Sequence, residues 1–308
     1  MSDKFYQKPA LLFSEQLEHL KGKGMIFVDP TRALNQLACI SYYRLSGYWY
    51  PFRARNEHGI VTSRFEPETH FDSAIALYEF DRKLRALVLD AIERVEVVIR
   101  TQFTYHIGHT YGAFGHANAQ NFHSGFNHQN WLKKLEDEAS RSSDEFINHY
   151  QRKYKGFPTI PIWMLTEVMS LGALSFGYMG LINDQKNGVE DKKAIAQQFN
   201  LHYKRLGDWL HTLTYVRNIC AHHSRLWNRE LAIRPDKVKE HTWRPPITPT
   251  NNRIFYILLM LRHLLRVTDN GDIWANSISE LLTPFAEQKR WRVAMGLPEN
   301  WQDHPLWK

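Results

Sequence analysis

Apolar residues recur at spacings of three and four along most of the chain, a period typical of amphipathic helices. The longest such stretch covers residues 71–107, where one buried stripe is expected from Leu84, Leu87, Val88, Ala91, Val95 and Val98. The same reading predicts one polar helix at 130–154 and one buried apolar helix at 161–181 that contains Glu167. Further helices are predicted at residues 14–24, 29–40, 191–199, 203–224, 252–268 and 277–291. Strand signals are few, so the pattern predicts an all-α protein.

Loops separate these stretches. Residues 56–70 indicate a loop or short hairpin, and residues 108–130 form a loop rich in Gly, Asn and His. We expect an N-terminal helical extension at 1–66 and a helical domain at 67–308 that forms one compact unit and includes extra C-terminal helices.

Composition favours an anionic partner. The chain of 308 residues carries a formal net charge of +7, which points to nucleic acid first and an anionic membrane surface second. Cys39 and Cys220 lie too far apart in sequence to suggest a disulfide framework or a cysteine zinc site. The N-terminus lacks the order of a signal peptide, and the longest apolar run, 253–267, is too short to span a bilayer. A cytoplasmic protein with no membrane partner is therefore expected.

One segment, YVRNICAHHSRLWNREL at 215–231, places basic residues on an apolar helix. On a helical wheel Arg217 falls in the middle of the apolar face, which consists of Leu206, Leu210, Leu213, Val216 and Cys220. A separate polar stripe consists of His211, Tyr215, Asn218 and His222. One interpretation is a buried ion pair between Arg217 and an acid of the long helix or Glu167, because a guanidinium stays charged in a protein. His222 would then be stabilised by the helix dipole.

The other interpretation is phosphate chemistry. The planar fork of Arg217 matches a phosphodiester, and His222 can transfer a proton near neutral pH. Asn218 could orient His222 or bind a phosphate oxygen. Arg217 and His222 point about 140° apart on the helix, separated by ~7.5 Å along its axis. A second proton carrier would come from His223, His211 or a symmetric partner chain.

Arg217-Asn218 followed by His222 resembles the R-[NDH]-x-x-x-H signature of HEPN domains, which are four-helix RNase and RNA-binding modules. More of the chain is similar to Abi-like abortive-infection proteins of the AbiD and AbiF types. The similar segments are residues 40–53, 80–102, 161–175, 213–231 and 296–307.

The resemblance implies an all-α HEPN-like bundle, a role in phage defence, and a homodimer with a composite site. It also implies a ribonuclease or RNA-binding activity, and a small regulatory RNA as a second RNA partner beside the substrate. Glu93, Glu96 and Arg100 stand where the family has its long-helix polar signature, and His223 is a further supporting residue. No metal and no small-molecule cofactor is expected.

Four other arginines are candidates for RNA binding. Arg44 and Arg53 lie in an aromatic segment that could stack bases, although Tyr42, Leu45 and Trp49 of that segment are also expected core anchors. Arg225 and Arg229 follow the motif and could track phosphates or simply lie at the surface.

Three readings follow from the sequence. The first is a metal-independent endoribonuclease that uses Arg217, Asn218 and His222 in a toxin-like defence protein. The second is a non-catalytic RNA-binding protein that acts by sequestration or by forming a complex with a small RNA. The third is a helical interaction protein in which Arg217 is a structural ion pair.

Overall fold

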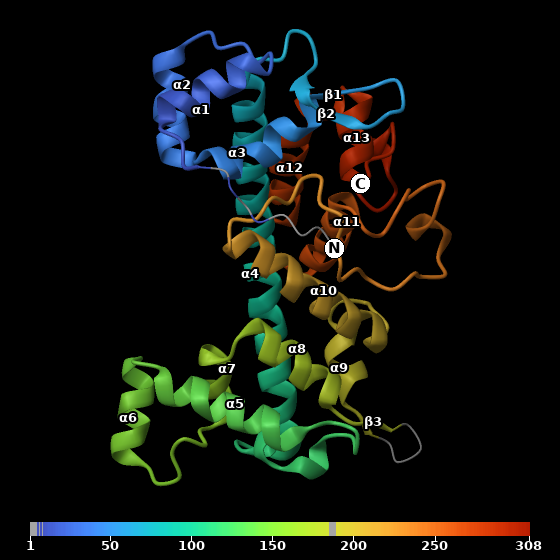
Figure 1. Cartoon of the computed structure of the whole chain (residues 1–308). Coiled ribbons are helices and arrows are strands. Elements are labelled where there is room, and N and C mark those ends of the chain that lie inside the picture. The colour runs from blue at the N-terminus through green and yellow to red at the C-terminus, as the bar shows by residue number, and fades with distance from the viewer. Residues whose placement is uncertain (1–4, 6, 8, 185–188) are drawn as a thin grey trace. The chain divides into compact units, whose positions relative to one another are not determined.

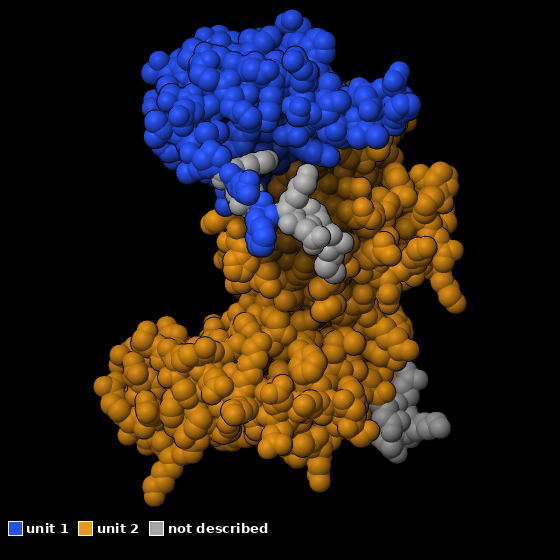
Figure 2. Space-filling view, viewed as in Figure 1, with its two compact units in different colours: residues 1–83 blue, residues 84–308 orange. Residues whose placement is uncertain are grey.

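A computed structural model describes residues 5, 7, 9–184 and 189–308 and is built mainly from thirteen α-helices (Figure 1). The described residues form only two small two-stranded sheets, β1–β2 and β3–β4, so the all-α prediction is confirmed. The chain divides into two compact units, residues 1–83 and 84–308, which Figure 2 shows in different colours. The domain boundary at residue 66 stays a prediction.

The first unit contains three short helices and a hairpin. Its helices are α1 (Phe13–Gly22), α2 (Pro30–Ile40) and α3 (Tyr42–Trp49), and its strands are β1 (Arg53–Arg55) and β2 (Val61–Phe65). The Asp29 carboxylate accepts a hydrogen bond of 2.9 Å from the Arg32 amide, and this cap starts α2 at Pro30. Leu45 and Trp49 are fully buried, with the half-buried Tyr42 ring 5.0 Å from Trp49, so the aromatic segment supplies core anchors.

Helix α4 (Phe71–Tyr111) begins in the first unit and continues through the second. In the second unit its predicted stripe is buried at Leu84, Val88, Ala91 and Val95, while Leu87 and Val98 are half-buried. The stripe continues through Ile99, Phe103 and Ile107, which are also fully buried. Helix α4 therefore provides one continuous apolar stripe that is buried in the core of the second unit.

The predicted helix at 130–154 is two helices, α5 (His128–Arg141) and α6 (Glu145–Lys153). They are separated by a local turn, in which the Ser142 hydroxyl donates to the Asp144 carboxylate at 2.6 Å and accepts from the Asp144 amide at 3.2 Å. Serine and aspartate favour such turns because their side chains compete for backbone hydrogen bonds.

The predicted buried helix at 161–181 is also wrong as a single element. It consists of α7 (Ile162–Val168) and α8 (Leu171–Gly180), which are broken at Met169 and Ser170. Ser170 has extended backbone angles and its hydroxyl accepts from the Ala173 amide, so it caps a new helix. Glu167, expected inside the buried helix, is exposed on α7.

The remaining elements complete the second unit. They are β3 (Asn183–Asp184), β4 (Val189–Glu190), α9 (Asp191–Gln197), α10 (Tyr203–Ala221), α11 (Ile254–Leu264), α12 (Gly271–Ala286) and α13 (Lys289–Met295). The predicted last helix at 277–291 is thus α12 and α13, and the predicted loop at 108–130 contains two short 3₁₀ turns at 115–117 and 119–121. Helix α11 is buried along nearly its whole length.

One buried histidine lies in the 108–130 loop. His116 is 1% exposed, and its Nδ1 has no hydrogen-bond partner among the described residues. Its carbonyl oxygen is 2.8 Å from His128 Nε2. Burial, with a smaller contribution from the charge of His128, lowers the pKa of His116 to about 4.

This burial predicts acid sensitivity. The neutral imidazole is retained in the folded chain, whereas the unfolded chain binds a proton below the ordinary pKa of about 6.5. The neutral His116 therefore contributes its full share to the free energy of unfolding above pH ~6.5. This contribution, about 3 kcal/mol in total, is lost as the pH falls toward 4. Urea unfolding of the wild type and His116→Gln between pH 7.5 and 4 measures this loss. Parallel pH profiles for the two proteins would contradict the prediction.

Candidate functional site

Helix α10 carries the motif, and its apolar face is as predicted. Leu206, Leu210, Leu213, Val216 and Cys220 are each no more than 1% exposed. The neighbouring face contacts α8 through small residues, since a Cβ atom at Gly207 would lie 2.0 Å from Met179 Sδ, and one at Gly172 would lie 3.5 Å from Thr214 Cγ2. These two contacts place α8 and α10 side by side and antiparallel.

Arg217 is exposed, although the wheel places it on the apolar face. The antiparallel register explains this. Gly172 lies level with Thr214, and α8 begins only one residue before Gly172. Arg217 is almost one turn beyond Thr214, so no turn of α8 covers it.

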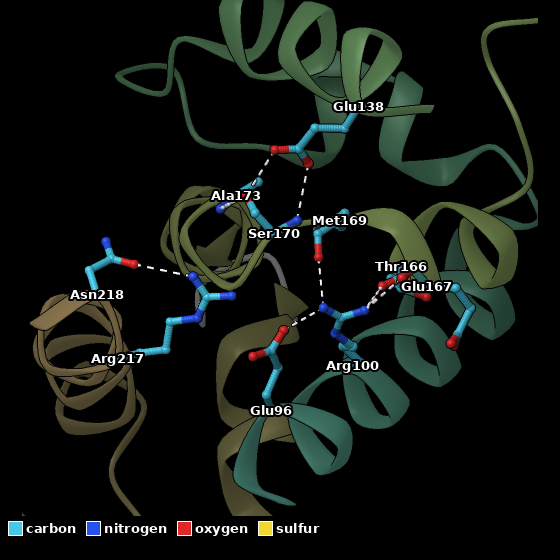
Figure 3. A network of polar contacts seen from close by, with 10 residues as sticks. All are labelled: Glu96, Arg100, Glu138, Thr166, Glu167, Met169, Ser170, Ala173, Arg217 and Asn218. Atoms are coloured by element: carbon cyan, nitrogen blue, oxygen red, sulfur yellow. Dashed lines mark hydrogen bonds and ion pairs between the residues drawn. The ribbon is translucent and has the colours of Figure 1, made fainter. Parts of the chain in front are cut away.

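No described carboxylate forms an ion pair with Arg217; its Nη1 donates instead to the Asn218 side-chain oxygen at 3.3 Å. The buried ion pair is therefore contradicted. An exposed guanidinium keeps its hydration and needs no internal acid. In Figure 3 the Arg217 side chain extends from α10 toward the side on which Glu96 and Arg100 are drawn.

Helix α10 ends in a strained turn at the two histidines. The His223 amide donates to the Cys220 carbonyl at 3.0 Å, and the Ser224 amide donates to the Ile219 carbonyl at 2.9 Å. This pattern requires a left-handed residue, and His223 has φ +55° where glycine is usual. The conformation costs about 1 kcal/mol or more. Burial of Leu226 and Trp227 directly afterwards offsets that cost and fixes the turn.

His222 and His223 are both exposed at this turn, with His222 as the C-cap residue of α10. The structure records no hydrogen bond between His222 and Arg217, which is consistent with their divergence on the helix. His211 is exposed on the same stripe as His222 but eleven residues earlier, a separation of about 16 Å along the axis. His211 and His222 of one chain therefore cannot act on the same phosphate.

The break between α7 and α8 is fixed by side chains from two other helices (Figure 3). Arg100 of α4 donates to the carbonyl oxygens of Thr166, Glu167 and Met169 at 2.6, 2.9 and 2.8 Å, and it also pairs with Glu96. From α5, Glu138 accepts hydrogen bonds from the Ser170 amide and hydroxyl at 3.1 and 2.8 Å.

Sequence reasoning missed Glu138 and Ser170. Serine is a preferred N-cap residue, so Ser170 was recognisable as a helix start. Nothing local marks Glu138, which lies 32 residues before its partner.

The supporting acids of α4 differ in their surroundings. Glu96 is part-buried and ion-paired with Arg100, whereas Glu93 is exposed one turn earlier and has no hydrogen-bond partner among the described residues. Glu96 therefore stabilises Arg100, and Glu93 remains an unengaged carboxylate on the same helix.

The other arginines lie elsewhere. Arg225 and Arg229 are half-buried in the segment after α10, where Arg229 Nε donates to the Arg225 carbonyl at 2.8 Å. Arg44 is exposed on α3, and the Arg53 guanidinium lies 5.8 Å from the Tyr50 ring. Arg44 and Arg53 belong to the first unit, and Arg217 belongs to the second.

Most histidines of the 108–130 region and the end of α4 make hydrogen bonds within the protein. His106 contacts the buried Asp191 carboxylate at 2.6 Å, and His109 contacts the Tyr105 carbonyl at 2.9 Å. Over residues 9–184 and 189–308, no group of three or more His, Cys, Asp or Glu residues is arranged to hold a metal ion.

Comparison with known proteins decides the family. The profile of the Abi-like protein family matches residues 35–228, more than half of the chain, and this range includes α4, the α7–α8 break and the motif of α10. The chain belongs to the Abi-like protein family. Membership implies an abortive-infection function. Searches of curated proteins and of solved structures found no match. No helix of the described chain is long and apolar enough to cross a membrane.

The Arg100 contacts predict a large stability loss in Arg100→Met. This variant keeps the aliphatic stem but leaves three carbonyls and Glu96 without their donor. We expect a loss of about 3 kcal/mol in the free energy of unfolding. Arg94→Met is the matched control, because Arg94 forms a partly exposed i,i+4 pair with Asp90 on the same helix and contacts no helix break, so it should lose less than about 0.5 kcal/mol. Urea denaturation compares the two, and equal losses would contradict the role assigned to Arg100.

Proposed function

We propose that this Abi-like protein is an endoribonuclease of the HEPN type that acts in phage defence, with Arg217, Asn218 and His222 in its active site. The observation that carries the proposal is the exposed guanidinium of Arg217, which no described carboxylate neutralises, beside Asn218 and near the exposed histidines at the end of α10. An accessible arginine without an acidic partner can bind a phosphodiester.

The chemistry requires no metal. The 2′-oxygen of the RNA attacks the adjacent phosphorus while the bond from phosphorus to the 5′-oxygen breaks, giving a 2′,3′-cyclic phosphate and a 5′-hydroxyl. One imidazole removes the 2′-proton and another protonates the leaving oxygen. Arg217 stabilises the charge that develops on the non-bridging oxygens. Asn218 orients the Arg217 guanidinium through their hydrogen bond.

Two copies of the chain would supply the groups that one copy lacks. Within one chain Arg217 and His222 diverge, and His211 is too distant along α10. A homodimer that brings two α10 ends together would place Arg217 of one chain near His222 of the partner subunit and provide two imidazoles. His223, on the same strained turn, is the other source of a second proton carrier.

Binding of RNA without cleavage is the second candidate. The same divergence of Arg217 and His222 favours it, because a single chain then offers separate contacts for phosphates rather than one reactive centre. Such a protein would act by sequestering RNA or by forming a complex with a small regulatory RNA.

Variants of the motif should abolish cleavage. In EDTA, the wild type should cut mixed RNA and leave cyclic or 3′-phosphate ends. Arg217→Ala should lower the rate by about 10²-fold or more, since it removes transition-state stabilisation. His222→Ala should lower it by about 10²–10⁴-fold, since it removes a proton carrier. Arg141→Ala changes an exposed arginine at the end of α5 and is the matched control.

Cleavage by both motif variants at the wild-type rate would refute the nuclease proposal. Salt-dependent RNA binding by all proteins, without cleavage by any, would establish the second candidate instead. His223→Asn tests whether His223 is the second proton carrier, since asparagine tolerates the left-handed backbone but has no imidazole.

The composite site predicts that activity depends on protein concentration. Specific activity should fall as the protein is diluted below the dissociation constant of the dimer, because separated chains lack the second imidazole. Light scattering over the same dilution series measures the oligomeric state. Constant specific activity through full dissociation would place all catalytic groups in one chain.

A further inference from the structure

One cavity lies outside the family match, which ends at residue 228. It has a volume of about 540 Å³ and is formed by the segment between α10 and α11, coloured yellow to orange in Figure 1, together with Tyr256 of α11. This volume is within the range of small-molecule sites. The RNA-cleaving site proposed for α10 contributes no residue to it.

The lining is basic. Arg234, Lys237 and Arg244 lie around the cavity, and none of its described lining residues is an Asp or Glu. Arg234 and Lys237 are exposed and make no side-chain hydrogen bond or ion pair with a described residue. Three like charges around one cavity repel one another unless an anion lies between them.

Two nearby carboxylates, Asp208 and Glu240, act electrostatically on the Tyr256 hydroxyl, and the Arg205 charge opposes them. Both carboxylate oxygens of Glu240 accept from Arg205 Nη2 at 2.7 Å, and this contact holds the pKa of Glu240 below its usual value. Asp208 accepts a hydrogen bond of 2.9 Å from the Asp236 amide. Arg244 Nε donates to the Val238 carbonyl, which fixes the side chain at the cavity.

A buried hydroxyl also lacks a partner. Tyr256 is 1% exposed and lines the cavity, yet its hydroxyl makes no hydrogen bond with a described residue. Leaving such a group unsatisfied is costly, and a native protein rarely does so without a reason. Burial raises the pKa of Tyr256, so the hydroxyl remains protonated and can donate. The Trp243 ring, 5.0 Å from the Tyr256 ring, holds it in place.

We propose that this cavity binds a phosphate monoester of nucleotide size, whose phosphate contacts Arg234, Lys237 and Arg244 and accepts a hydrogen bond from the Tyr256 hydroxyl. Paired cationic forks and a neutral donor are the groups that bind phosphate oxygens. The apolar walls at Trp243 and Pro245 suit the sugar and base that carry the phosphate. The phosphate can belong to a free nucleotide or to the 5′ end of an RNA strand.

Calorimetric titration of the full chain at low salt tests the proposal. The probes are inorganic phosphate, AMP, and an RNA trinucleotide with and without a 5′-phosphate. Arg234→Gln/Lys237→Gln should weaken binding of AMP at least tenfold. Tyr256→Phe should weaken it about fivefold while leaving the melting temperature of the free protein unchanged or higher, because the hydroxyl has no partner there. Lys239→Gln removes an exposed lysine of the same segment that does not line the cavity, and it should bind as the wild type does.

The measured affinities distinguish an RNA end from a free nucleotide as the ligand, and they can also overturn the proposal. Tighter binding of the 5′-phosphorylated trinucleotide than of AMP would support the site and identify an RNA end as its ligand. Equal binding would support it with a free nucleotide. The proposal is overturned by no binding of any probe, by unchanged affinity in the Tyr256→Phe and double variants, or by equal weakening in Lys239→Gln. Binding is measured without RNA cleavage, so failure here would leave the nuclease proposal untouched.

Discussion

The contact between Arg100 and the end of α7 determines how the candidate site is built. The last carbonyls of a helix have no partners within it, and a break between two helices exposes more of them. Arg100 supplies donors to three such carbonyls, and Glu96 balances its charge. Glu138 satisfies the opposite side of the break by accepting from Ser170. With both sides satisfied, the chain can end α7 and start α8 in a new direction.

The position of that break explains why Arg217 is accessible. Helix α8 runs antiparallel to α10 and begins almost level with Thr214, so the last turn of α10 extends beyond its neighbour. If residues 161–181 formed one continuous helix, it would continue past this turn and cover Arg217. The guanidinium would then need a buried acid. Because α8 begins too late to pack over Arg217, the arginine keeps its hydration. Its only described side-chain partner is the neutral Asn218.

The sequence predicts the helices well and their interruptions poorly. Apolar spacing located α2, α4 and α10, and the cap at Asp29 located the start of α2, because these signals lie within a few residues of each other. Apolar spacing failed at Ser170, since the apolar pattern continues across the break and, besides the local Ser170 cap, the distant Arg100 and Glu138 stabilise it. The wheel also misjudged Arg217, because a wheel assumes that a neighbouring helix covers the whole length of a face. The left-handed turn at His223 had no glycine to mark it.

The directions of Arg217 and His222 limit what a single chain can do. The two side chains point about 140° apart on α10 and are separated by ~7.5 Å along its axis. We propose that a second chain brings the two kinds of group to one phosphate. In the proposed function, catalysis and self-association are therefore coupled. In that proposal a catalytic chain acts as a pair, whereas a chain that remains single would present Arg217 and His222 as separate contacts for RNA phosphates.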